Sequence, residues 1–188
     1  GCPWDREQTH ESIKNNLLEE CYEVVEAIDE DDIDSLIEEL GDVLLHVVFH
    51  ATIGKEDGYF NINDIIESAS KKMIYRHPHV FKDDNVETSE VNWEELKKKE
   101  KEYNTISDEI DGIAKTLPAL TKAHKVQKKV AKVGFDFEDV NEAATKVEEE
   151  LKEVLDVYKS NNREKIINEV GDLIFACVNV SRMLSVDE

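Results

Sequence analysis

The sequence predicts an all-α protein that is built from two related helical bundles in tandem. Apolar residues recur three and four positions apart through several long segments, which is the period of an amphipathic helix. No segment alternates apolar and polar residues strongly enough to predict a strand. An acidic pattern in the first half of the chain returns in the second half, which indicates a duplicated helical unit.

The duplicated pattern consists of two acidic signatures, E-E-x-x-E and E-x-x-D, with fifteen residues between them. The first copy runs from Glu19 to Asp42 and the second from Glu149 to Asp172, a shift of 130 positions. Gly41 and several apolar positions move in the same register. One acidic pair would be weak evidence in so acidic a chain. A set of acidic, glycine and apolar positions that repeats in register indicates a duplicated unit.

Two helices are expected in the first copy, over residues 9–28 and 33–53. Between them lies a polar turn in which Asp31 or Asp32 caps the second helix. That second helix is apolar on nearly all sides, as buried helices are, so a second copy or a second subunit is expected to cover it. The first helix carries one apolar stripe, formed by Leu17, Leu18, Cys21, Val24, Val25 and Ile28.

Two more helices are expected after this pair. Asn61 or Asn63 caps the third, which ends at Pro78. Residues 80–92 are polar and irregular, and residues 93–103 form a short charged helix.

A linker is expected over residues 105–118, where Gly112 and Pro118 interrupt a weak periodicity. It separates a first domain, residues 1–104, from a second domain, residues 119–188. Helices in the second domain are expected over residues 119–133, 141–158 and 163–184.

The sequence also predicts the structure near each end of the chain. Residues 2–5 are expected to be extended, because Pro3 disfavours helix for the residue before it. The second copy stops at Glu188, sixteen residues after Asp172, so counterparts of the third and fourth helices are absent and the second domain is incomplete.

Composition argues against several classes of partner. A net charge of −21 opposes binding to nucleic-acid polymers and to anionic membranes. No apolar run has the length of a membrane span, and no signal peptide is evident. The three cysteines, Cys2, Cys21 and Cys177, are far apart and odd in number, which favours a reducing cytoplasm over a disulfide framework.

The acids of each copy are candidate ligands of a metal ion. Residues three apart share a helix face, so Glu20 and Glu23 point the same way, as do Glu39 and Asp42. In an antiparallel pair these four carboxylates would meet, and their repulsion would require a cation. Oxygen ligands suit Mg²⁺, with Mn²⁺ as a substitute. The matching ligands of the second copy are Glu150, Glu153, Glu169 and Asp172.

A solvated acidic face is the simpler alternative, but such a face need not repeat in register. A bound Mg²⁺ takes phosphate oxygens as further ligands and lowers the pKa of a bound water. Glu19 is then the candidate base that accepts a proton from the attacking water.

Cationic and aromatic residues follow the first acids. Lys72 and Arg76 are four apart on one face, as are Trp93 and Lys97. Beside a metal site they become candidate phosphate clamps, and Trp93 could stack on a base. Taken alone, the cations are ordinary surface charge, and Trp93 is equally well explained as a core anchor.

Histidines offer a transition-metal alternative, since His46 and His50 are four apart on the second helix. The second copy has Ala176 and Val180 at these positions yet keeps all its acids, so the acidic site does not need them. A ferritin-like di-iron site would need two E-x-x-H motifs, and the one that ends at His10 has no counterpart.

Together these motifs resemble the MazG family of nucleoside triphosphate pyrophosphohydrolases, over almost the whole chain. The acidic signature alone would also fit the related dimeric dUTPases and phosphoribosyl-ATP pyrophosphohydrolases. The landmarks beside the acids are Gly1-Cys2-Pro3-Trp4-Asp5, Gln8-Thr9, Val48-Phe49-His50-Ala51, Arg76-His77-Pro78-His79-Val80-Phe81, Trp93-Glu94, Pro118-Ala119-Leu120 and Val133-Gly134-Phe135-Asp136.

The resemblance implies tandem MazG-like helical bundles that associate as a homodimer. It also implies Mg²⁺-dependent cleavage of nucleoside triphosphates between the α- and β-phosphates, which yields the monophosphate and pyrophosphate. The eight acids above are then metal ligands. The catalytic group is Glu19, Glu20, Glu23, Glu39 and Asp42, and the substrate-binding group is Lys72, Arg76, Trp93 and Lys97.

Two other functions stay open at this point. The incomplete second copy favours a non-catalytic dimeric module that binds metal or nucleotide, and a narrow-specificity relative such as a dUTPase shares the acidic signature. Which copy hydrolyses substrate, and which base and sugar it prefers, is not encoded in the carboxylate spacing.

Overall fold

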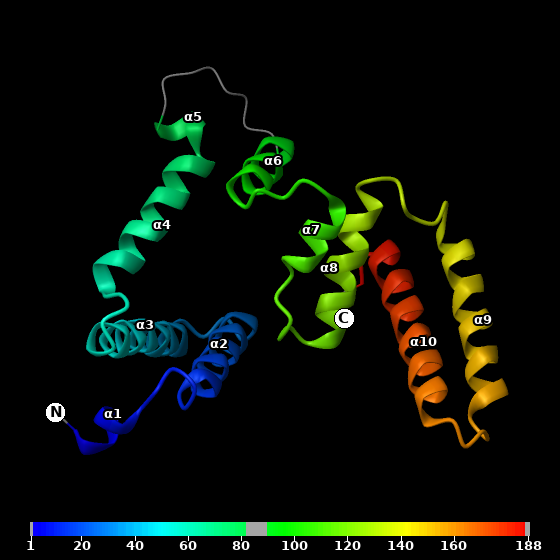
Figure 1. The fold of residues 1–188 in the computed structure, drawn as a ribbon, viewed down its shortest axis with the longest axis horizontal. Helices are drawn as coiled ribbons and strands as arrows, with labels where there is room; N and C mark the ends of the chain where they lie inside the picture. Colours follow the sequence, from blue (N-terminus) through cyan, green and yellow to red (C-terminus); the bar gives the residue numbers. More distant parts are fainter. Residues whose placement is uncertain (1, 82–89, 187–188) are drawn as a thin grey trace. The chain divides into compact units, whose positions relative to one another are not determined.

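The structure is a computed structural model that describes residues 2–81 and 90–186. All regular structure in these two ranges is helical, which confirms the predicted all-α class. The chain divides into two compact units, Gly1–Trp93 and Glu94–Glu188 (Figure 1).

The first unit is built around a helical hairpin. Its two long helices, α2 (Lys14–Asp29) and α3 (Ile33–Glu56), pack along each other. The connection between them contains Asp31 in a left-handed conformation, with a φ of 54°. The remaining helices are α1 (Pro3–Glu7), α4 (Ile62–Arg76), α5 (Pro78–Phe81) and α6 (Glu90–Glu100), which begins here and continues into the second unit.

Capping side chains begin α3 and α4 where the sequence predicts. Asp32 accepts hydrogen bonds from the backbone N–H groups of Asp34 and Ser35, both at 3.1 Å, and so satisfies donors at the start of α3. Asn61 begins α4 with a capping box, in which its own backbone N–H donates to Asp64 Oδ2 at 2.8 Å.

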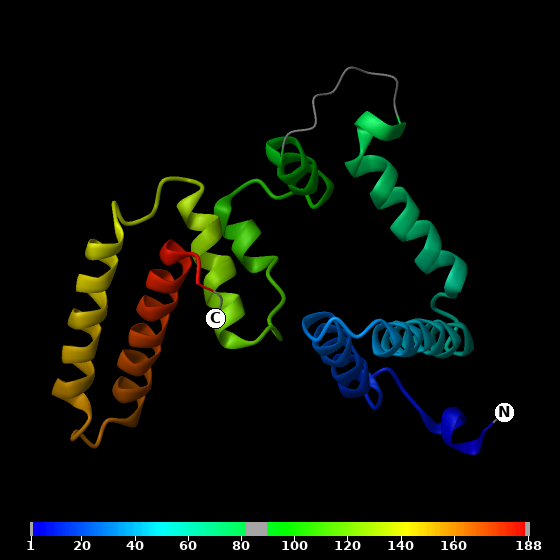
Figure 2. The ribbon, with the colours of Figure 1, turned by 180° about the vertical axis from the view of Figure 1, so that it is seen from behind.

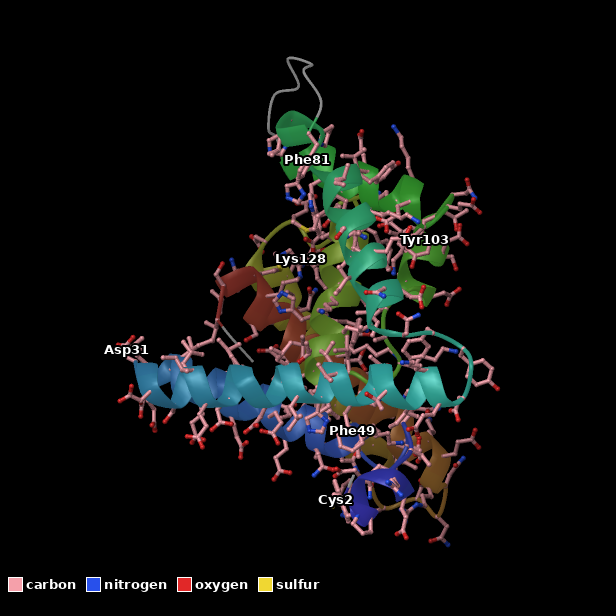
Figure 3. All side chains as sticks on the ribbon, turned by 90° about the vertical axis from the view of Figure 1, so that its left-hand side faces the viewer. Cys2, Asp31, Phe49, Phe81, Tyr103 and Lys128 are labelled. Atoms are coloured by element: carbon pink, nitrogen blue, oxygen red, sulfur yellow. The ribbon has the colours of Figure 1, made fainter. Side chains whose placement is uncertain are left out.

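The apolar stripe predicted on α2 lies on two faces rather than one. Leu17 and Val24 are half-buried, whereas Leu18 and Val25 are exposed. Figure 3 shows α3 side-on, starting beside the labelled Asp31, with side chains projecting along its length. The predicted cover of α3 by a second copy or a second subunit stays a prediction. In the single chain α3 exposes Ile33, Ile37, Leu40, Leu44, Leu45 and Val48.

The start of the chain also differs from the prediction. A short helix, α1, replaces the extended lead-in expected at residues 2–5, because Pro3 occupies the first helical position, where proline is favoured. Residues 9–12 form a hydrogen-bonded turn, so α2 begins at Lys14 rather than at residue 9.

The region predicted to be irregular, residues 80–92, contains the end of α5 and the start of α6, and residues 82–89 of it lie outside the described part. α6 ends at Glu100 rather than at residue 103, because Glu102 adopts a left-handed φ of 55° that no helix continues through.

The second unit pairs two helices in the same way. α10 (Arg163–Leu184) packs against both α9 (Val140–Val157) and α8 (Ala119–Ala131), and Figures 1 and 2 show it between them from opposite sides. The bounds of α10 match the predicted range of 163–184. None of the helices in the described residues is both long and apolar enough to cross a membrane.

A helix also occupies part of the predicted linker, residues 105–118. α7 (Ile106–Asp111) is too short for a periodic pattern to reveal it. Its Glu109 is buried, and the carboxylate accepts hydrogen bonds from Lys98 at 2.7 Å and Lys129 at 3.0 Å. Burial acts to raise the pKa of Glu109, but the two ammonium groups outweigh it and hold the pKa below its ordinary value. The domain boundaries 1–104 and 119–188 stay a prediction.

The 130-residue repeat of the sequence corresponds to a repeated hairpin. Ile13 and its counterpart Ala143 are both buried, as are Ala27 and its counterpart Val157. The α2–α3 and α9–α10 hairpins therefore use equivalent positions for packing, which leaves the acids of both copies at equivalent places along the paired helices.

Candidate metal centres

The first acidic centre lies on the facing sides of α2 and α3. Oxygen atoms of Glu20, Glu23 and Glu39 all lie within 4.8 Å of one another. Glu20 and Glu23 share a helix face because they are three apart, and the hairpin brings Glu39 opposite them. Three of the four predicted ligands therefore meet, and Asp42 lies outside this group of three although it is half-buried on the same helix.

Electrostatics at this centre favour a cation. Burial raises the pKa of Glu20, and repulsion from Glu23 and Asp42 raises it further. Burial also raises the pKa of Glu39, with repulsion from Glu23 as the next cause. The charge of Asp42 thus helps to raise the pKa of Glu20 on α2 and of Glu39 on α3. A divalent cation would relieve the repulsion among the four carboxylates.

The second acidic centre lies on α9 and α10. Oxygen atoms of Glu150, Glu169 and Asp172 lie within 4.8 Å of one another. Glu153 completes the predicted set through a hydrogen bond with Glu169, which raises the pKa of Glu153, and burial raises it further. The two copies therefore group different triplets, because Asp42 lies outside the group in the first copy and Glu153 lies outside it in the second.

Burial distinguishes the second centre from the first. Glu150 is only 6% exposed, and its Oε2 is buried without a hydrogen-bond partner in the described part of the chain. Glu150 and Asp172 line a cavity of about 590 Å³, whose wall also includes Gln127, Phe135 and Phe175. A buried carboxylate oxygen without a donor fits a metal ligand, since a buried polar atom without a partner is otherwise costly.

Glu19 is exposed on α2 and does not belong to the first group of three. It lies on an open stretch of the α2 surface, together with Glu23 and Tyr22. Its role as the base stays a prediction.

Of the four predicted substrate-binding residues, Arg76 and Trp93 lie together in the structure. The guanidinium carbon of Arg76 lies 5.3 Å from the centre of the Trp93 ring, a cation–π distance. Trp93 remains 38% exposed, which argues against its role as a core anchor. Lys72 is exposed on α4, and Lys97 belongs to the second unit, so the grouping of these two with the first acids stays a prediction.

The histidines form a contact that the sequence reasoning missed. His46 Nε2 lies 3.9 Å from Glu20 Oε1, beside the first centre. His50 instead meets His10, with the two Nδ1 atoms 2.7 Å apart. The rings are nearly parallel, and His10 also stacks on Phe60. No local spacing could reveal a pair forty residues apart, because only the packing of the turn before α2 against α3 brings it together.

Acidification is expected to break the contact between His10 and His50. Burial holds the pKa of His50 below its ordinary value of 6.5, and the neighbouring His10 and His46 lower it further. Because the folded-state pKa is lower than the unfolded one, this contact stabilises the fold fully above pH 6.5 and less as the pH falls toward the folded pKa. We expect the melting temperature of the wild type to fall more steeply than that of His50→Gln over this window. His79→Gln serves as the control, and equal slopes for the wild type and His50→Gln would contradict the prediction.

Comparison with known proteins places these hairpins in a family. Residues 8–81 match the family model described as "MazG nucleotide pyrophosphohydrolase domain", and residues 117–186 match that of "Phosphoribosyl-ATP pyrophosphohydrolase". The Thermotoga maritima protein named "Nucleoside triphosphate pyrophosphohydrolase/pyrophosphatase MazG" is 49% identical over 187 residues, which cover 100% of this chain and 71% of the relative. This chain belongs to the MazG family. The resemblance seen in the sequence motifs is confirmed.

Other relatives extend the comparison across bacteria. The nucleoside triphosphate pyrophosphohydrolase of Escherichia coli K12 is 44% identical over 191 residues, covering 98% of this MazG-family chain and 72% of the relative. The Bacillus subtilis protein YabN, described as uncharacterized, is 52% identical, and the chain covers 39% of its length. Membership of the MazG family also confirms the tandem helical architecture expected from the repeat.

Proposed function

We propose that this chain is a metal-dependent nucleoside triphosphate pyrophosphohydrolase. It converts nucleoside or deoxynucleoside triphosphate and water into the monophosphate and pyrophosphate. The observation that carries the proposal is the pair of three-carboxylate groups, each within 4.8 Å, on equivalent hairpins of a MazG-family chain. Relatives at 44% and 49% identity that carry this activity in their names support it.

Mg²⁺ is the proposed cofactor, and Mn²⁺ is its substitute, because the donor set consists of carboxylate oxygens. The proposed ligands are Glu20, Glu23, Glu39 and Asp42 in the first unit and Glu150, Glu153, Glu169 and Asp172 in the second. When bound, the ion neutralises phosphate charge and lowers the pKa of a bound water.

The cationic and aromatic side chains and Glu19 have further proposed roles. Arg76, which faces Trp93, is proposed to bind phosphate oxygens through its planar guanidinium, with Lys72 and Lys97 as further clamps. Trp93 is proposed to stack on the base, and Glu19 to accept the proton of the attacking water.

A homodimer is the proposed assembly. One face of α3 exposes Ile37, Leu40 and Leu44, and α2 exposes Leu18 and Val25. Exposed apolar side chains of this kind mark an interface where they form one patch. A second copy of the hairpin offers the same surface and would complete a four-helix bundle. We also propose that the protein acts in the cytoplasm on free nucleotides, because its net charge of −21 disfavours nucleic-acid polymers.

The test is product analysis on a panel of the four ribonucleoside and the deoxynucleoside triphosphates with Mg²⁺. Pyrophosphate and monophosphate are expected, and chelation of the metal is expected to stop their release. Release of single phosphates would contradict the proposal. Nucleotide binding without turnover would favour the non-catalytic module, and turnover of dUTP alone would identify a narrow-specificity dUTPase.

A further inference from the structure

The loop that follows α8 forms part of the cavity beside the second acidic centre. Residues 134–137 all line this cavity of about 590 Å³, to which Glu150 and Asp172 also contribute. The loop contains Gly134-Phe135-Asp136, a sequence landmark with no role in the hydrolysis proposed above. Gly134 opens the loop with a left-handed φ of 83°, a conformation that glycine adopts at no steric cost.

Aromatic rings gather at this cavity. Phe135 and Phe137 of the loop line it together with Phe175 of α10. Phe135 is 79% exposed, so its ring is available to a ligand. Aromatic rings bind nucleobases by stacking on their flat faces. A cavity with these rings near the carboxylates of the second centre therefore fits the base of a nucleotide.

An ion pair ties the loop to α10. Nη2 of Arg182 donates to Asp136 Oδ1 at 2.5 Å. The same guanidinium donates to Asn179 Oδ1, from Nε at 2.9 Å and from Nη2 at 2.7 Å. Asn179 is buried, and the side chains of Arg182 and Asp136 are only 14% and 28% exposed, so solvent screens this pair less than a surface pair. Because Asp136 lies between Phe135 and Phe137 in the chain, the ion pair restrains the backbone that carries both rings.

The first copy is built differently at this place. The shift of 130 positions puts Arg6 and Thr52 where the second copy has Asp136 and Arg182. An arginine and a threonine cannot form this ion pair. Residues 4–7, which correspond to the loop, belong to α1 instead. The acids repeat between the two copies, whereas the loop and its ion pair do not.

We propose that Arg182 is a positioning residue of the second centre, which acts through Asp136 to hold Phe135 and Phe137 where the nucleobase of the substrate stacks. The inference rests on the proposed function and assigns the base-binding part of one of its two sites. Every base has a flat π-face, so these rings bind any of the bases rather than selecting one. They favour nucleotides over inorganic polyphosphates, which have no base.

The test compares two ligands in the presence of Mg²⁺, in a Glu39→Gln background that removes a proposed ligand of the first centre. One is the α,β-methylene analogue of ATP, which cannot be cleaved between these phosphates, and the other is inorganic tripolyphosphate. Calorimetry of Arg182→Leu is expected to show affinity for the analogue about tenfold lower than in the parent, as for the loss of a base stack. Affinity for tripolyphosphate is expected to stay unchanged, and Phe135→Ala is expected to give the same pattern.

Further variants show whether Arg182 acts through the loop. The double variant Arg182→Leu/Phe135→Ala is expected to lose no more affinity for the analogue than Phe135→Ala alone, because both changes remove the same stacking contact. Asp136→Ala leaves α10 intact and is expected to reproduce the loss seen in Arg182→Leu, even if the latter variant does not fold. Lys115→Leu, at an exposed position of the second unit, is the control and is expected to change neither affinity.

Three results would overturn the inference. Equal losses of affinity for both ligands would indicate a general loosening of the fold. Additive losses in the double variant would show that Arg182 does not act through the loop. Unchanged affinity for the analogue in Asp136→Ala, or a parent that does not bind the analogue, would remove the base-binding role. None of these readouts needs turnover, so a failure of the proposed hydrolysis would be seen separately in product analysis.

Discussion

Replacing Glu39 and Glu169 together by glutamine is expected to lower pyrophosphate release at least about a hundredfold. A catalytic metal ion supplies several kcal/mol of transition-state stabilisation, and about 1.4 kcal/mol corresponds to a tenfold change in rate. Glu39 and Glu169 are equivalent in the repeat, and each belongs to its unit's group of three carboxylates. Glutamine keeps the shape of the side chain but removes the charge that a hard cation requires.

The two single variants identify the active copy. If Glu39→Gln abolishes turnover and Glu169→Gln does not, the first unit is the enzyme, and the reverse result assigns catalysis to the second centre. Glu164→Gln, at an exposed position of α10, is the control and is expected to keep wild-type turnover. Pyrophosphate release by the double variant at the wild-type rate would contradict the assignment of the acids.

Replacing Leu44 by aspartate is expected to convert a dimeric protein into a monomer. Leu44 is 62% exposed in the middle of the apolar face of α3, beside Leu40 and Val48. Burying a leucine contributes about 1.5–3 kcal/mol, and a two-fold interface contains the substituted position twice. The dissociation constant is therefore expected to rise at least about a hundredfold, to which the buried charge adds.

Sedimentation of the wild type and of Leu44→Asp over a range of concentrations measures this change. Tyr59→Asp is the matched control, because Tyr59 is an exposed apolar residue in the turn after α3 and lies off the face. A variant that sediments at the size of the wild type would contradict the proposed dimer surface, as would a monomeric wild type.

Local sequence determined the long helices and the pairing of acids along each of them, whereas it did not reveal the short helices α1 and α7. Hydrophobic period, capping residues and three-residue spacing act within a few turns, so they can be read without knowing the fold. Three features were predicted in this way: the range of α10, the cap at Asp32 and the equivalence of Glu20 with Glu150. The repeat of the acids in register also indicated that the two halves share one architecture.

Only the tertiary structure decided which side chains meet across helices. The contact of His10 with His50, the tie of Glu109 to Lys98 and Lys129, and the different carboxylate triplets of the two centres join residues distant in sequence. Packing within the chain also decided that one face of α3 is exposed there. The spacing of residues along one helix determines which side of the helix a side chain lies on. It does not determine how deeply that side chain is buried or which side chains of other helices it contacts, because these depend on how each hairpin packs.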